Sequence, residues 1–423
     1  MKDFSGVDNK STIAAENQFA QEAVIDSPIF TYLFNEKHQY APGGSGVLNG
    51  KKVSIKATFD VKGYATTGGC KLLGNLVATE DAEAVKLLKE AGARCVGHTN
   101  MTELAYSGLG LNPHFGTPEN PIVKGAIPGG STSGGAVSVA KGYADIALGT
   151  DTGGSLRIPA AFCGLTGFKP SQYTVSRKGC LPLSDYLDSV GPIASTVKEC
   201  RIAWEVMSKN PLQLSEPTYE NVEFIVPSNF GFDGIDSTVL SLFKDALVKI
   251  KQAGFNVTTQ HIDLLDEYKK LPIWHFSAVE SRRHYGKNID LSSDQLDPRV
   301  KSRIERGLAV SDEAFEQTCE QRDRLIKEYE TRYKNVIFVL PTVACEAPRF
   351  EDLLKDSDYD HYNLLCLRNT SMANVLNGCS ISLPHQFNGL TAGVMLNMTE
   401  GQDECLLSVA ERIESLLNTG DKR

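Results

Sequence analysis

Apolar residues along this chain fall into two kinds of segment. Short apolar runs bounded by turn-forming residues are typical of β-strands. Longer segments, in which apolar residues recur every three or four positions, are typical of helices with one buried face. The short runs predict a strand and turn at 52–63 and strands at 94–97, 222–226, 336–340, 381–384 and 391–396.

The periodic segments predict most of the helices. We expect helices at 8–36 with a break at Pro28, at 82–91, 133–141, 197–207, 237–252, 264–285 with an interruption at Pro272, 312–333 and 403–417. Because strands alternate with helices along the whole chain, the pattern predicts an α/β fold. The polar, proline-containing connector at 210–219 is a candidate domain boundary.

Composition narrows the class of protein. The 423-residue chain is 41% hydrophobic, enough for a large core, and carries a net charge of −9. No basic run indicates a nucleic-acid or membrane surface, and no stretch approaches the ~18 apolar residues of a membrane span. The first residues lack the apolar region of a secretory signal. Ten cysteines without C-x-x-C spacing indicate free thiols, so we expect a cytoplasmic protein.

Two Gly-Gly-Ser turns, at 129–131 and 153–155, carry the candidate chemistry. Each places a serine oxygen before a segment that can be helical, and its small residues leave backbone N–H groups open to a carbonyl oxygen. One such turn alone is more often structural. Two of them, with the mostly apolar run 144–148 between, favour acyl transfer. No G-x-S-x-G elbow, P-loop, H-E-x-x-H or G-x-G-x-x-G motif competes, and no histidine lies near either turn in sequence.

The segment 129–169 resembles the diagnostic segment of the amidase signature family. That segment combines a GGSS-type turn and a small-residue helix with the motifs D-x-G-G-S-x-R-x-P and C-G-x-x-G-x-K-P. This chain has DTGGSLRIP at 151–159 and CGLTGFKP at 163–170. Weaker similarity extends from about residue 53 to the C-terminus. The resemblance implies one compact domain over 1–423, with a large mixed central sheet covered by helices. Its signature core spans about 53–196, and a C-terminal part at about 220–418 completes the same fold.

The resemblance also implies a catalytic set. Ser155 is the nucleophile, Ser131 relays the proton, and Lys56 is the base that accepts it. The family's usual V-x-K-D pattern has Asp where this chain has Ala57. Ser131 is expected to follow a cis peptide bond to Gly130. The mechanism requires no metal and no organic cofactor.

Other positions follow from the same resemblance. Backbone N–H groups from Thr152 through Gly153 and Gly154 to Ser155 form the expected oxyanion hole. Expected substrate-binding residues, by their place in or near the family's pocket segments, are Met101, Tyr106, Ser133 and Arg368. A helix cap near residue 100 and a structural ion pair at Arg368 are equally compatible with these stretches. The charged and aromatic residues of 274–284 favour a packed helix with solvated charge over a second site.

The resulting prediction is an amidase that acts on a small amide. It releases the acid and ammonia or an amine through an acyl-enzyme on Ser155. The runner-up is the glutaminase component (the A component) of a tRNA-dependent amidotransferase, which passes ammonia to a partner. A catalytically silent binding relative is a third interpretation, against which the intact Lys56, Ser131 and Ser155 argue. We expect a small-molecule amide as the partner, with no direct nucleic-acid or membrane contact, and leave a homodimer open.

Overall fold

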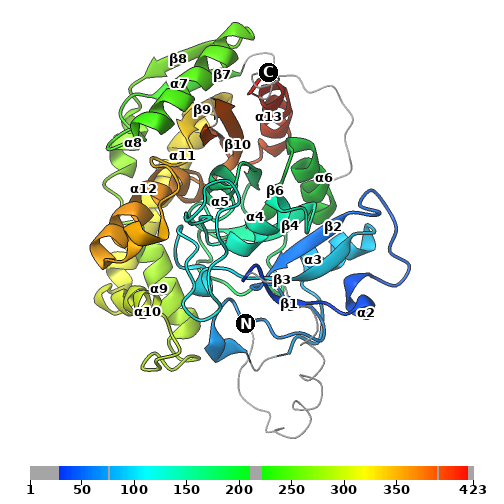
Figure 1. The fold of residues 1–423 in the computed structure, drawn as a ribbon. Helices are drawn as coiled ribbons and strands as arrows, with labels where there is room; N and C mark the ends of the chain where they lie inside the picture. Colours follow the sequence, from blue (N-terminus) through cyan, green and yellow to red (C-terminus); the bar gives the residue numbers. More distant parts are fainter. Residues whose placement is uncertain (1–27, 75–76, 210–221, 388–389, 418–423) are drawn as a thin grey trace, which may run out of the picture.

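The computed structural model describes residues 28–74, 77–209, 222–387 and 390–417. Within these residues, eleven strands form one mixed sheet in the order β1-β3-β2-β4-β6-β5-β10-β11-β9-β7-β8 (Figure 1). β2 is parallel to β3 and β4, and β7 is parallel to β8 and β9, whereas the remaining pairs are antiparallel. The strands are β1 (Phe30–Leu33), β2 (Lys52–Lys56), β3 (Arg94–Thr99), β4 (Ile146–Asp151), β5 (Thr166–Lys169), β6 (Ser189–Ala194), β7 (Glu223–Pro227), β8 (Val257–Gln260), β9 (Val336–Pro341), β10 (Cys379–Phe387) and β11 (Leu390–Met398).

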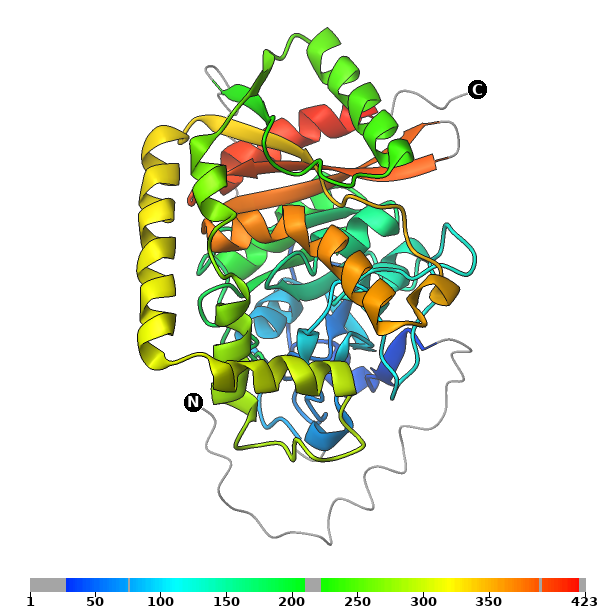
Figure 2. The same cartoon turned by 90° about the vertical axis from the view of Figure 1, so that its left-hand side faces the viewer.

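Helices cover both faces of the sheet (Figures 1 and 2). One hydrophobic cluster joins α3, α6, α7 and α13 to one face, and clusters on the other face include α4, α5, α8, α9, α11 and α12. The α-helices are α2 (Glu36–Gln39), α3 (Glu83–Glu90), α4 (Ser133–Ala140), α5 (Arg157–Phe162), α6 (Val197–Ser208), α7 (Ser237–Gln252), α8 (Asp263–Tyr268), α9 (Trp274–Tyr285), α10 (Pro298–Glu305), α11 (Asp312–Arg332), α12 (Asp356–Val375) and α13 (Asp403–Leu417).

The strand β9 shows why its sequence is a continuous apolar run. Ile337 and Val339 enter the cluster on one face of the sheet, while Phe338 and Leu340 enter the cluster on the other. Successive side chains of a strand point to opposite faces, so a strand covered by helices on both sides is apolar at every position.

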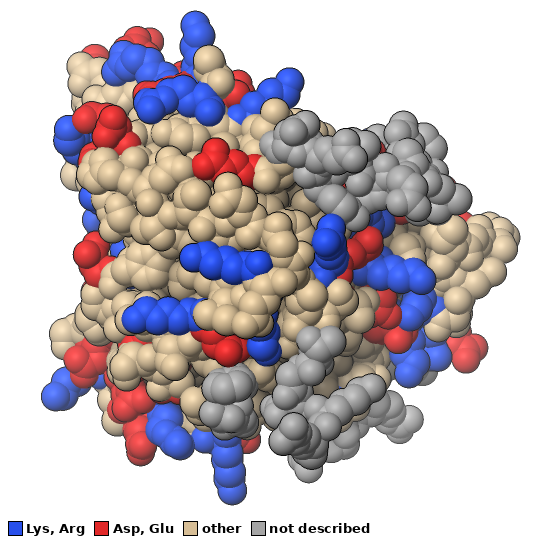
Figure 3. Space-filling view, turned by 90° about the horizontal axis from the view of Figure 1, so that it is seen from above, with Lys and Arg blue, Asp and Glu red and all other residues tan. Residues whose placement is uncertain are grey.

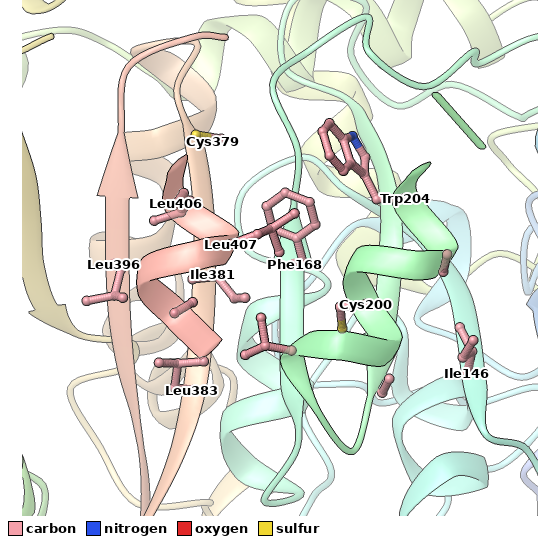
Figure 4. Packing of buried hydrophobic residues seen from close by; sticks show 14 of the residues in the cluster. Ile146, Phe168, Cys200, Trp204, Cys379, Ile381, Leu383, Leu396, Leu406 and Leu407 are labelled. Carbon is pink, nitrogen blue, oxygen red and sulfur yellow. The ribbon is translucent and has the colours of Figure 1, made fainter. Parts of the chain in front are cut away.

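Figure 4 shows the buried hydrophobic side chains beneath α6 and α13 from close by. Leu406 and Leu407 of α13 lie over β10 and β5, and Trp204 of α6 meets Phe168 of β5 edge to face, with ring centroids 6.0 Å apart. Edge-to-face contacts of this kind stabilise an apolar core beyond the area they bury. These helices seal the face of the central strands that lies opposite α4 and α5.

Most predicted elements are present, and the predicted α/β class with a large mixed sheet is confirmed. The expected helix 8–36 is wrong at Phe30–Leu33, which form β1 and pair antiparallel with β3. The part of that expectation before residue 28 and the connector 210–219 lie outside the described residues. The helix α12 was not predicted, and the expected strand 381–384 is the centre of the longer β10.

The described structure has neither a membrane-spanning helix nor, on the face seen in Figure 3, a surface of one charge. In the described part of the chain, no helix is both long and apolar enough to cross a membrane. On the face seen in Figure 3, basic and acidic side chains are interspersed among uncharged ones. All ten cysteines are free thiols.

Candidate active site

Lys56 is the last residue of β2 and lies between two neighbouring parallel strands. Its side chain is fully buried, and Nζ donates to Ser131 Oγ at 2.8 Å and to Thr150 Oγ1 at 2.8 Å. Burial lowers the pKa of Lys56 from 10.5 to about 7, against the opposing fields of Cys180, Asp151 and Asp188. A lysine poised in this way can accept a proton at neutral pH.

Ser131 occupies a tight turn before α4. The expected cis peptide bond between Gly130 and Ser131 is present. A Cβ on Gly130 would lie 2.6 Å from the backbone nitrogen of Gly110, so this position requires glycine. The Ser131 carbonyl accepts from Thr102 N at 3.1 Å, and the hydroxyl is fully buried beside the Lys56 amine.

Ser155 lies in the turn that connects β4 to α5. Thr132 N donates to the Ser155 carbonyl at 3.3 Å, which joins this turn to the Ser131 turn. Gly154 has φ +135°, and a Cβ there would lie 2.2 Å from Thr370 Oγ1, so only glycine fits. The two serine turns, far apart from Lys56 in sequence, therefore converge on one site.

A buried ion pair shapes the Ser155 turn. Asp151 and Arg157 are fully buried, with Nη2 and Oδ1 2.8 Å apart. The Asp151 carboxylate also accepts from Gly154 N at 2.8 Å and Leu156 N at 3.0 Å. Burial alone would raise the pKa of Asp151, but the charge and hydrogen bonds of Arg157 and the Leu156 N–H lower it to about 2. The carboxylate is therefore a permanent acceptor that closes the turn.

The N–H groups of this turn differ in availability. The Gly154 N–H is used by Asp151, so it is not open to a ligand. Among the described residues, no hydrogen-bond partner is found for the N–H groups of Thr152, Gly153 and Ser155. Thr152, Gly153 and Ser155 also line a cavity next to this turn. Of the expected oxyanion donors, the N–H groups of Thr152, Gly153 and Ser155 are open, and only that of Gly154 is not.

A cavity of about 690 Å³ opens onto Ser155. Its walls are largely apolar, and its charged residues are Lys269, Arg303, Arg306, Arg368, Asp233 and Asp360. The remaining lining residues are Ala105, Tyr106, Ser107, Thr152, Gly153, Leu183, Leu187, Phe230, Gly231, Tyr268, Ile273, Trp274, Ser277, Ala278, Asn363, Leu364, Leu367 and Ser371. The volume is within the range typical of small-molecule sites.

The expected substrate-binding residues separate into two groups. Tyr106 and Arg368 line the cavity, whereas Met101 and Ser133 do not. Met101 is fully buried in an apolar cluster, and Ser133 is fully buried at the start of α4. Their closeness in sequence to the motifs therefore does not bring these two side chains to the cavity wall.

Arg368 makes no ion pair within the described residues. Its guanidinium donates to the carbonyls of Asp233 and of Gly231, the latter at 3.1 Å, and to Asn369 Oδ1 at 3.3 Å. A guanidinium has five N–H groups, so two of them remain for a ligand. Arg368 therefore also anchors the loop that carries Gly231 and Asp233, a role that was not expected from the sequence.

Three functional contacts were not recognised from the sequence. Thr150 shares the Lys56 amine with Ser131, Asn374 donates to the Asp151 carbonyl at 2.9 Å, and Asp188 accepts from Thr152 Oγ1 at 2.5 Å. Thr150 had one local signal, since it is a hydroxyl at the end of an apolar strand next to the motif. The other two contacts join residues more than thirty positions apart. The helix α9 at 274–285 is packed as expected, but its Trp274 and Ser277 also line the cavity.

Comparisons with known proteins identify the family of this chain. The family model described as Amidase matches residues 34–407. An indoleacetamide hydrolase of Pseudomonas syringae pv. syringae is 31% identical over 407 residues, covering 91% of this chain and 88% of that protein. The A component of the glutamyl-tRNA(Gln) amidotransferase of Natronomonas pharaonis is 38% identical over 240 residues, covering 53% of this chain and 56% of that protein. A crystal structure of an amidase shares 29% identity with a TM-score of 0.79, covering 89% of this chain and 86% of that one.

Proposed function

This chain belongs to the amidase family, and from that premise we propose that it hydrolyses a small carboxylic amide through an acyl-enzyme on Ser155. The observation that carries the proposal is the 2.8 Å bond from the buried Lys56 amine to Ser131, next to a serine that opens onto a cavity. The products are the acid and ammonia or an amine. The other serines that line this cavity, Ser107, Ser277 and Ser371, donate to amide or carbonyl oxygens and not to a base.

The proposed reaction begins with a proton relay. Ser155 Oγ attacks the amide carbonyl while its proton passes to Ser131 Oγ, and the Ser131 proton passes to the neutral Lys56 Nζ. The step requires a neutral amine, and a pKa of about 7 provides one in about half of the molecules at pH 7. Ser131 then returns a proton to the leaving nitrogen as the C–N bond breaks. Water hydrolyses the acyl-enzyme by the same relay.

The open N–H groups of the Ser155 turn support the charged intermediate. Thr152, Gly153 and Ser155 offer donors to the oxyanion, and each such donor contributes about 3–4 kcal/mol in comparable hydrolases. Because the Gly154 N–H is bonded to Asp151, we assign Gly154 a conformational role. The donors are fixed before substrate binds, which avoids reorganisation during the reaction.

The cavity supports an acyl group of moderate size. Apolar side chains such as Leu183, Leu187 and Phe230 line it, and its basic residues outnumber its acidic ones. We therefore propose an acyl chain with an apolar body and a distal acceptor such as a carboxylate or carbonyl. Arg368 is the proposed partner of that acceptor through its two unused N–H groups.

A second candidate function is the glutaminase component of an amidotransferase. The observation that favours it is the 38% identity to the A component of an amidotransferase over residues that span about half of each chain. In that case, glutamine is the amide donor, and the ammonia passes to a partner protein. The two candidates share the same chemistry and differ in what receives the ammonia.

The deciding experiment measures ammonia release from a panel of amides that includes glutamine, with Ser155→Ala as the matched control. We expect turnover of one or more non-glutamine amides by the isolated chain and none by the variant. Mass spectrometry should detect the acyl group on the Ser155 peptide. Preference for glutamine only in the presence of a partner supports the second candidate. Full activity of Ser155→Ala, or an adduct on Cys163, contradicts the proposed nucleophile.

A further inference from the structure

The peptide that carries the Gly153 N–H is held less directly than its neighbours. The preceding peptide is fixed at the Asp151 carbonyl by Asn374 Nδ2 at 2.9 Å. The following peptide is fixed at the Gly153 carbonyl by Thr370 Oγ1 at 2.5 Å. In the described part of the chain, neither the Thr152 carbonyl nor the Gly153 N–H has a hydrogen-bond partner. Among the described residues, the peptide between Thr152 and Gly153 is therefore restrained by hydrogen bonding only through the Thr152 side chain.

Asp188 supplies that restraint from outside the turn. Its Oδ1 accepts from Thr152 Oγ1 at 2.5 Å, and its Oδ2 accepts from Leu183 N at 2.8 Å and Ser184 N at 3.1 Å. Three converging donors match an ionised carboxylate, which only accepts hydrogen bonds. The carboxylate is buried, so these bonds are not exchanged with water.

The segment that carries Asp188 is itself fixed on two sides. Asp188 directly precedes β6, in which Ser189 pairs with Asp151 of β4. On the other side, the buried Glu280 of α9 accepts from Ser184 Oγ and from Asp185 N at 3.0 Å. The Asp188 carboxylate is therefore a fixed point between a cavity-wall helix and the sheet.

We propose that Asp188 is a positioning residue, which orients Thr152 and thereby holds the Gly153 N–H where the oxyanion forms. This inference rests on the proposed function of the Ser155 turn. Asp188 makes no hydrogen bond to the nucleophile or the relay, so its effect on the Gly153 N–H passes through Thr152. A misplacement of about 1 Å at an active site can cost about a hundredfold in rate.

The charge of Asp188 should also influence the pKa of Lys56. Lys56 is faced by Asp151 of β4, by Asp188 ahead of β6 and by Cys180 of the loop between β5 and β6. A negative charge near an amine favours its protonated form. Loss of the Asp188 charge should therefore lower the pKa of Lys56 further, and the acid limb of the rate profile should move to lower pH.

The test compares Thr152→Val with Thr152→Ser, which differ in the hydroxyl that meets Asp188. We expect Thr152→Val to lower kcat and kcat/KM together by about ten- to a hundredfold, as for loss of a transition-state contact. Thr152→Ser restores the hydroxyl and should recover most of the rate that Thr152→Val loses. Asp188→Asn keeps a polar group against Thr152 but removes the charge, so its acid limb should move down while that of Thr152→Val does not. Thermal unfolding of each variant confirms that it is folded.

A second readout separates this inference from the proposed function. A fluorophosphonate probe forms a bond between Ser155 Oγ and phosphorus with loss of fluoride, and its rate requires the same N–H groups but no amide substrate. If the parent labels Ser155 yet hydrolyses no amide, the proposed function fails, and slower labelling of Thr152→Val than of Thr152→Ser still supports the positioning role. Equal rates for those two variants in labelling and turnover overturn the inference.

Discussion

Replacing Lys56 by methionine should remove the proposed base and, with it, one pH-dependent part of the protein's stability. Lys56 is fully buried, and burial lowers its pKa from 10.5 to about 7. In the unfolded chain the amine is in water and regains a pKa of about 10.4. Between these two values, the unfolded state binds the additional proton, so the stability of the parent protein rises as the pH rises. Methionine fills a similar volume and carries no charge.

The expected magnitude follows from the two pKa values. Keeping Lys56 in its folded site costs on the order of 4 kcal/mol at pH 7 relative to an amine that never charges, and on the order of 1 kcal/mol at pH 10. The variant also loses the hydrogen bonds to Ser131 and Thr150, and each buried hydroxyl left unpaired costs about 1–3 kcal/mol. For the two hydroxyls together that loss is about 2–6 kcal/mol, enough to offset the gain at pH 7, but it does not depend on pH. The stability difference between variant and parent should therefore shrink by about 3 kcal/mol from pH 7 to pH 10.

Urea unfolding at several pH values between about 7 and 10, under reducing conditions, measures this difference. Burial also lowers the pKa of Lys169 to about 8, but that contribution is common to both proteins and cancels. Lys287→Met is the matched control, because Lys287 is exposed and stays in water in both states. A stability difference that is the same at every pH would mean that Lys56 keeps its proton in the folded protein. The proposed base would then be excluded.

The remaining predictions concern catalysis. The rate should rise with pH through about 7 as folded Lys56 loses its proton, and a flat profile from about pH 5.5 to 8.5 would contradict the lysine base. Lys56→Ala and Ser131→Ala should each lower kcat by several orders of magnitude, and steady-state kinetics of the double variant should show little further loss, because the two residues act in one relay. If the losses of the two single variants add in the double variant, Lys56 and Ser131 do not act in one relay. Arg368→Lys keeps charge but loses the planar fork, so KM should rise more for an amide with a distal carboxylate than for a neutral amide of equal size. An equal rise for both would place the effect of Arg368 in the loop that carries Gly231 and Asp233.

Elements whose form depends on residues close together in the sequence could be predicted from it. The helix α7 has the predicted bounds of Ser237–Gln252, because Asp236 caps its first N–H groups and its apolar residues recur on one side. The strand β2 and the two serine turns were likewise recognisable from short patterns. These features depend on residues that are close together in sequence.

Elements whose form depends on distant partners were not recognisable. Phe30–Leu33 form a strand because β3 offers an edge, although the segment itself resembled part of a helix. The helix α12 has no single apolar face, because its C-terminal half is buried and contributes polar groups such as Asn374 to the Ser155 turn. Thr152 and Asp188 are 36 positions apart and meet through the pairing of β4 with β6. No local pattern encodes that contact.

The position of Lys56 in the sheet explains how a lysine serves as a base in this fold. β2 has a strand on each side and helices over both faces, so the last side chain of the strand ends in a dry interior. A lysine on an edge strand would reach water and keep its ordinary pKa, and almost none of it would be neutral at pH 7. Here the amine has the hydroxyls of Ser131 and Thr150 as acceptors, which stabilise its position without a countercharge in direct contact. A carboxylate in contact would favour the protonated amine, so the neutral hydroxyl partners are part of what leaves this base free to accept a proton.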